Sequence, residues 1–193
     1  METLKTPPQV VPYMPVIPGL QFYATMRASG EYYGALGAAG PITPITMVAD
    51  KLYCIPFLVL KTETFNGIAI DVQTLSAGNA RLGIYNDNGA CAPGTLLVDA
   101  GAVDTGTTGA KEIVINQSLQ PGLYWLAAIF NATPKVYGPT TIPNLLGLKT
   151  PSVASCGCYS WYYTTQVYGE LPTPHPAPTL YGSSPCGISL KRA

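Results

Sequence analysis

The sequence predicts an all-β protein: an antiparallel, jelly-roll-like β-sandwich with an extended, proline-rich N-terminal arm. Three observations predict this fold. Short apolar runs separated by turn residues fill the chain from about residue 50 onward, several of these runs alternate apolar and polar residues, and no window of eleven or more residues has helical periodicity. Seven or eight such strands with frequent turn signals are typical of sandwiches and jelly rolls.

Residues 1–27 are predicted to form the arm. Five prolines between residues 7 and 18 fix φ and remove backbone donors, so neither a helix nor a central strand is available there. The arm is also apolar and almost uncharged, whereas disordered tails are rich in charge. We therefore expect it to lie along a neighbouring subunit, through an assembly interface formed by Val10, Val11, Tyr13, Met14, Val16 and Ile17.

Residues 28–193 are predicted to form the sandwich domain, with a Cys-, Tyr- and Pro-rich C-terminal extension from about residue 152. Residues 28–47 are rich in Gly, Ala, Pro and Thr, which indicates loop with short strand pieces. In residues 65–75, Ile68, Ile70 and Val72 share one face and Asp71 and Gln73 the other, as in a half-buried strand. Strands are expected at residues 51–61, 65–75, 79–85, 95–103, 111–119, 123–131, 160–167 and 187–191.

Two of these strands and one turn carry a more specific expectation. Residues 123–130 are apolar on both faces, so this strand should lie centrally, with the core on one side and loops or a partner on the other. Residues 86–89 tolerate positive φ and predict a turn rather than a calcium loop, which would need a distal Glu. Residues 187–191 are expected to close an edge of a sheet.

The composition is unusually poor in charge. Only 10% of the residues are charged and 47% are hydrophobic, against roughly 25% charged residues in a typical domain. This shortage predicts that other subunits cover much of the surface. Zero net charge without a basic cluster argues against nucleic-acid binding.

Membrane insertion is the rival explanation of the low charge. The longest apolar stretches, such as residues 123–130, are much shorter than the ~20 residues of a spanning helix. The first twenty residues lack the basic region and continuous apolar core of a signal peptide. We therefore expect assembly in a cytoplasm and no membrane partner.

The five cysteines are Cys54, Cys91, Cys156, Cys158 and Cys186. An odd count without a secretion signal argues against a disulfide framework, and we expect small, buried hydrophobic side chains. The one-residue gap between Cys156 and Cys158 is not the usual zinc spacing. We predict no metal site and no cofactor.

Catalytic signals are weak. His175 is the single histidine and stands between Pro174 and Pro176, on a loop expected to be exposed, which does not suit a Ser-His or Cys-His mechanism. No phosphate loop or zinc-protease motif is found. A glycosidase remains an alternative, because the fold can bring together two carboxylates that are distant in the sequence. The sequence nevertheless favours a protein that is not an enzyme.

An aromatic run near the C-terminus is the sharpest feature outside the central strands. It contains Tyr159, Trp161, Tyr162 and Tyr163. Alternation puts Trp161 and Tyr163 on one face of a strand and Tyr162 on the other. Such side chains fill a sheet core or an interface, or stack on sugar rings as a glycan platform. We expect core or interface packing, with glycan binding as the alternative.

The segment ARLGIYNDNGACAPGTLLVDAGAVDTGTTGAKEIVINQSLQPGLYWLAAIF, preceded by EYYGALGAAG and LYCIPFLVL, resembles a module of tailed-bacteriophage virion proteins. A strand ending in LGIY, a turn, PG-LL-DAG, an alternating KEI-I strand and a closing GLYWLA strand carry the resemblance. It covers about half of the chain and implies a jelly-roll-like fold in a tail-fibre, minor tail or head-surface protein.

Three functional hypotheses follow. The first is a capsid decoration, or cement, protein that stabilises the head by binding neighbouring subunits, with itself, as a homotrimer, and the major capsid protein or other virion proteins as partners. The second is a tail-fibre or receptor-binding protein that recognises host glycans. The third is an enzyme acting on surface polysaccharide. The apolar arm favours the decoration hypothesis. We therefore expect the protein to be located in the virion.

Overall fold

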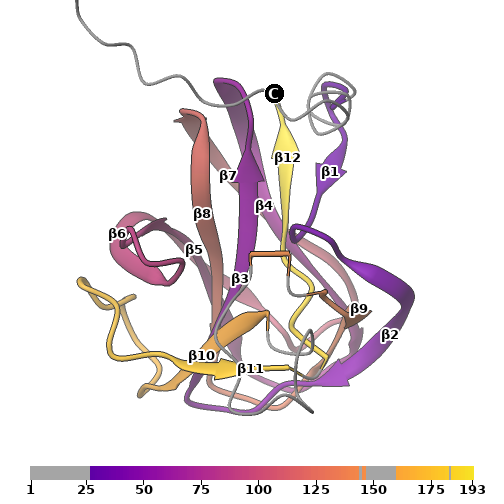
Figure 1. The fold of residues 1–193 in the computed structure, drawn as a ribbon. Coiled ribbons are helices and arrows are strands. Elements are labelled where there is room, and N and C mark those ends of the chain that lie inside the picture. Colours follow the sequence, from indigo (N-terminus) through magenta and orange to yellow (C-terminus); the bar gives the residue numbers. More distant parts are fainter. Residues whose placement is uncertain (1–26, 144, 147–159, 183) are drawn as a thin grey trace, which may run out of the picture.

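The computed structural model describes residues 27–143, 145–146, 160–182 and 184–193, and these residues form twelve strands and no helix (Figure 1). The six predicted interface residues of the arm and Tyr159 lie outside this part of the chain. The strands are β1 (Tyr32–Tyr33), β2 (Ala39–Thr46), β3 (Lys51–Val59), β4 (Glu63–Thr74), β5 (Asn79–Asp87), β6 (Pro93–Asp104), β7 (Gly109–Leu119), β8 (Gly122–Phe130), β9 (Lys135–Thr141), β10 (Trp161–Thr165), β11 (Thr179–Tyr181) and β12 (Ser189–Arg192).

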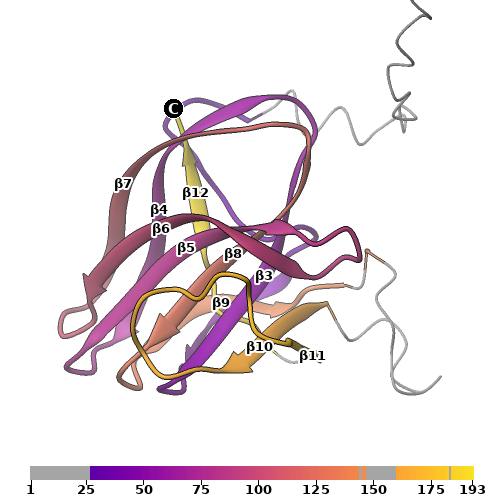
Figure 2. The ribbon, with the colours of Figure 1, turned by 90° about the vertical axis from the view of Figure 1, so that its left-hand side faces the viewer.

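The predicted antiparallel β-sandwich is confirmed. The strands β2 to β9 form two sheets with the orders β2-β9-β4-β7 and β3-β8-β5-β6, and every pairing is antiparallel. This is the strand order of a jelly roll, in which two Greek keys wrap into a double sheet. In Figure 2, β6, β5, β8, β3 and β10 follow one another across the molecule in the order of their pairing.

The core lies between the two sheets. Ile68, Ile70 and Val72 of β4 face Leu82 and Ile84 of β5 within one buried cluster, while Asp71 and Gln73 are exposed. The predicted alternation is therefore correct, because a strand with one buried face repeats its environment every second residue.

The strand β8 lies in the middle of its sheet, between β3 and β5. Its residues Leu126 and Ala128 belong to the main core, whereas Trp125 and Ala127 face the opposite side. There they form a second buried cluster under Leu171, which lies on the connection between β10 and β11. Both parts of the expectation for this strand are confirmed: it is central, and a loop covers its outer face.

The chain after β9 extends both sheets. The strands β10 and β11 continue the second sheet beside β3, and β12 pairs with β4. The prediction that residues 187–191 close an edge is wrong, because β1 lies outside β12. The position beside β4 is available because β7 occupies the other edge of β4, and β9 reaches β4 only at Val72 and Thr74.

Two strands of the first sheet contain proline, which made them difficult to predict from the sequence. The eight-residue β2 contains Pro41 and Pro44, in a region that the sequence predicts as loop with short pieces, and β9 contains Pro139. Neither β9 nor the three-residue β11 was predicted. The strand β2 tolerates proline because it is an edge strand, so some of its amides need no partner.

Two glycines allow the chain before β12 to cross β9. A Cβ atom at Gly187 would collide with the carbonyl oxygen of Tyr137, and a Cβ atom at Gly138 would collide with the carbonyl oxygen of Pro185. The backbones therefore touch at this point. No other residue type permits such an approach.

We predict that Gly187→Ala lowers the free energy of unfolding by roughly 1–3 kcal/mol, as overpacking does. Urea denaturation monitored by tryptophan fluorescence measures the effect. Gly169→Ala is the matched control, since nothing lies within 4 Å of a Cβ atom built there. Equal stability of the two variants would contradict the crossing.

Candidate functional site

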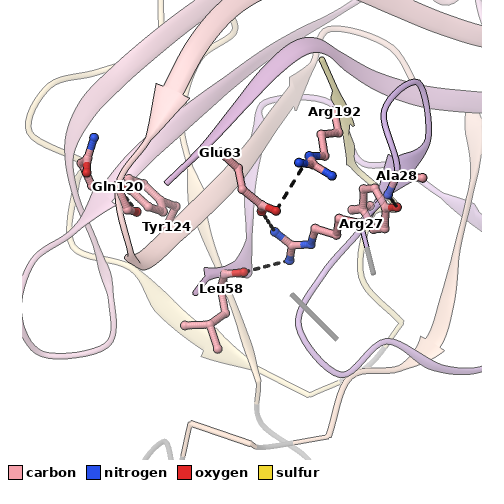
Figure 3. A network of polar contacts seen from close by, with 8 residues as sticks. Arg27, Ala28, Leu58, Glu63, Gln120, Tyr124 and Arg192 are labelled. Carbon is pink, nitrogen blue, oxygen red and sulfur yellow. Dashed lines mark hydrogen bonds and ion pairs between the residues drawn. The ribbon is translucent and has the colours of Figure 1, made fainter. Parts of the chain in front are cut away.

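The point where the arm joins the sandwich is fixed by Arg27. Its guanidinium donates one hydrogen bond to the Glu63 carboxylate, with Nη1 to Oε2 at 2.8 Å, and another to the carbonyl oxygen of Leu58 at 2.9 Å (Figure 3). The same group lies over the rings of Phe57 and Tyr33, at 4.7 and 5.3 Å from their centroids. The last residue of the predicted arm is thus part of the sandwich.

The Glu63 side chain is completely buried. Its atom Oε1 accepts no hydrogen bond within the described part of the chain, but Nε of Arg192 lies 3.9 Å away. Figure 3 shows both guanidinium groups turned toward this carboxylate. Because a buried charge needs compensation, Glu63 holds the start of the domain and its last strand together.

We predict that Arg27→Ala lowers the free energy of unfolding by about 3 kcal/mol, the lower end for breaking a buried pair, because Arg192 still compensates part of the charge. Chemical denaturation measures the loss. Lys191→Ala is the control: its pair with Glu112 is partly exposed, so we expect no measurable change. A neutral Arg27→Ala would show that the arm is not anchored here.

A groove lies on the first sheet, where β9 and β12 meet along β4. Its volume is about 440 Å³, and it is lined mainly by apolar atoms. Among the described residues that line it, Asp71 alone is charged. Small residues leave the space open; among them are Gly34, Ala35, Ala38, Ala69, Ala110, Gly138 and Gly187.

Large side chains with exposed surface border this groove. Tyr32, Ile42 and Tyr137 all line it and all remain well exposed. The Tyr32 hydroxyl donates a hydrogen bond to Glu112, and this bond raises the pKa of Tyr32. Lys191 lies on the other side of that carboxylate, 3.4 Å from its Oε1. The groove is thus an apolar hollow with a polar cluster at one end.

The aromatic run enters a packed cluster at the end of the sandwich. Trp161 is only 2% exposed; it stacks on Tyr53 at 5.7 Å and meets the edge of Tyr181 at 5.2 Å. Burial raises the pKa of Tyr53 to about 12. The Nζ atom of Lys51 lies 3.8 Å from the ring centroid of Tyr163, as in a cation–π contact.

The predicted division of this strand is correct. Trp161 and Tyr163 face the main core, whereas Tyr162 packs edge-on against Trp125 in the second cluster, at 5.2 Å. Both faces of β10 are therefore in contact with protein.

We predict that Trp161→Ala costs about 3–5 kcal/mol of stability, because removal of a large buried aromatic ring leaves a cavity. Tyr181→Ala is the comparison. Because Tyr181 is 39% exposed, this variant should lose clearly less stability. Thermal and urea unfolding of both variants measure this difference. A Trp161→Ala protein of wild-type stability would contradict a packing role.

The expectation of an exposed His175 is wrong. The side chain is 8% exposed, its Nε2 lies 3.3 Å from the Cys54 sulfur, and its ring meets Tyr85 at 5.1 Å. The reason is that the connection between β10 and β11 folds over the outer face of the second sheet. Leu171 of this connection is held there by a hydrogen bond from its amide to Asp99.

The contact between Cys54 and His175 is enclosed by protein. Burial raises the pKa of the Cys54 thiol and lowers the pKa of His175, so both groups are neutral. Cys54 is completely buried and offers a substrate no access. The pair packs the covering loop onto the sheet.

The interpretation of cysteines as buried hydrophobic residues is confirmed for Cys54 and Cys186, which are buried free thiols. Cys91 is half-buried, and Cys156 and Cys158 lie outside the described residues. Across the described ranges, no cluster of three or more His, Cys, Asp or Glu could hold a metal ion. The same ranges contain no apolar helix of membrane-spanning length.

The turn predicted at residues 86–89 begins two residues later than expected: Asn86 and Asp87 still belong to β5, and the chain turns from Asn88 until β6 begins at Pro93. The Asp87 carboxylate accepts a hydrogen bond from the Gly89 amide, and Asn88 accepts one from Ala90, both at 2.8 Å. Asp87 also accepts a hydrogen bond from the Trp125 indole at 2.9 Å. Its oxygens therefore stabilise the turn and the second cluster.

No known protein family, curated protein or solved structure matches the chain. The sequence did not predict the groove or the triad of Arg27, Glu63 and Arg192. One weak signal was present: Arg27 is the first charged residue after the uncharged stretch of residues 6–26. A single charge at the end of such a stretch is a candidate anchor.

Proposed function

We propose that this chain is a structural, non-enzymatic protein of a tailed-bacteriophage virion: a capsid decoration protein that stabilises the head by binding neighbouring subunits. The observation that carries the proposal is the anchored base of the arm, where Arg27 binds the buried Glu63. An arm can hold two subunits together only if its base is fixed, because a loose base would transmit no restraint. The phage resemblance of residues 50–131 supports the same assignment.

The surface of the sandwich supports a role in assembly. Exposed apolar side chains such as Ile42 and Val114 lie on the first sheet, on β2 and β7. With only 10% charged residues, the domain gains from covering such surface with other subunits. The proposed partners are copies of itself in a homotrimer and the major capsid protein, in particles assembled in the host cytoplasm.

A tail-fibre or receptor-binding function is the second candidate, and the exposed Tyr181 beside Tyr163 favours it, because aromatic faces stack on sugars. Two contacts argue against this candidate. Trp161 is enclosed, and the ammonium group of Lys51 already lies over the Tyr163 ring. A glycan would have to displace this contact.

The arm provides the test of the decoration function. We predict that replacing all six residues from Val10 to Ile17 named above with serine leaves the sandwich folded, with a single cooperative thermal transition. The variant should fail to incorporate into particles, and those particles should lose heat resistance. Gel analysis of purified particles and heat-inactivation curves measure both effects.

The control carries serine at the polar arm positions Gln9 and Gln21, and it should incorporate normally. Normal incorporation and heat resistance of the six-residue variant would refute the decoration function. Lost adsorption to host cells by intact, heat-resistant particles would instead support the receptor-binding candidate.

A further inference from the structure

The groove on the first sheet has the properties of a binding site for an uncharged, extended peptide. Its volume of about 440 Å³ is within the ordinary range of binding pockets. Tyr32 and Tyr137 line it together with Pro139, and Asp71 is the one charged residue in the part of the lining that the structure describes. Polyproline II segments bind to such aromatic-lined grooves, because their conformation is already formed and little entropy is lost on binding.

The chain itself contains a segment with the matching chemistry. Residues 6–26 carry no charged side chain, and Pro12, Pro15 and Pro18 are regularly spaced among Val, Ile, Tyr and Met. Prolines favour the extended polyproline II conformation. An uncharged segment adds no further charge to a groove whose described lining carries one, that of Asp71.

The arm is long enough to reach a second copy. The segment from Val10 to Leu20 lies between seventeen and seven residues before the anchor at Arg27. At about 3.1 Å per residue, an extended arm carries it roughly 20–55 Å away, whereas a domain of this size has a radius of gyration of about 15 Å. The groove wall begins at Tyr32, only five residues after the anchor.

We propose that the groove of one copy binds residues 10–20 of the arm of a second copy. Each copy then gives one arm and receives another, which is a heterologous contact that closes into a ring when the rotation allows it, as in a trimer. The inference rests on the proposed function for the role of the arm, but the contact itself forms between isolated chains.

Photo-crosslinking of the full-length protein tests the contact. The variant Tyr13→p-benzoylphenylalanine is prepared in ¹⁵N-labelled and unlabelled forms, which are mixed and irradiated, and the products are identified by mass spectrometry. We expect crosslinks between labelled and unlabelled chains, from position 13 to peptides that contain Tyr32, Ala69 or Tyr137. The same probe at the exposed Val167 should give no crosslink to these peptides.

Filling the groove provides a second test. Ala110 and Ala102 are both exposed strand residues, but only Ala110 lines the groove. Ala110→Trp should weaken self-association of the full-length chain at least about tenfold, whereas Ala102→Trp should leave it unchanged. Sedimentation velocity over a concentration series measures this. A synthetic peptide of residues 6–22 should dissociate the wild-type oligomer and should not bind to Ala110→Trp.

Crosslinks confined within single chains, with a monomeric wild-type protein, would show that the arm occupies its own groove and would overturn the proposal. Equal self-association of the Ala110→Trp and Ala102→Trp variants would also overturn it. These results are separate from the particle experiment. Crosslinks between copies with normal incorporation of the six-serine variant would refute the decoration function alone, and lost incorporation without groove crosslinks would refute the groove alone.

Discussion

The buried carboxylate of Glu63 is the constraint on which the arrangement of both chain ends depends. A charge inside a protein is tolerated only when opposite charges compensate it, so Arg27 and Arg192 must both reach the same end of β4. The first described residue and the last strand are thereby fixed to one point of the jelly roll. The proposed function depends on this fixed position of Arg27, because a restraint between two subunits requires a rigid base.

Fixing Arg192 also places β12 beside β4, and this placement shapes the surface of the first sheet. Since β12 and β9 share one edge of β4, the backbones must cross, and Gly138 and Gly187 make the crossing sterically feasible. The groove lies at this junction, where small residues leave a hollow. The anchor and the groove are therefore two consequences of one strand insertion: the proposed function uses the anchor, and the proposed contact between copies uses the groove.

The second sheet differs from the first, because the connection between β10 and β11 covers its outer face. Leu171 and His175 pack on this face, against Trp125, Tyr85 and Cys54. They bury an apolar surface that would otherwise need a partner to cover it. The aromatic cluster around Trp161 likewise buries its largest ring against Tyr53 and Tyr181. On the first sheet, by contrast, Ile42, Val114 and Tyr137 remain exposed, and this is the face that the proposed contacts between subunits would use.

The sequence by itself determined the fold class, the alternation of Ile68, Ile70 and Val72, and the central position of β8, because these depend on residue patterns within a single strand. It also divided Trp161 from Tyr162 correctly. The sequence did not reveal β2 and β9 because both contain proline. Whether a strand tolerates proline depends on whether it lies at the edge of a sheet. Only the tertiary structure decided the burial of His175 and the approach of Arg27 to Glu63. Those contacts join residues 121 and 36 positions apart, and no local pattern encodes which distant segment covers a sheet or compensates a buried charge.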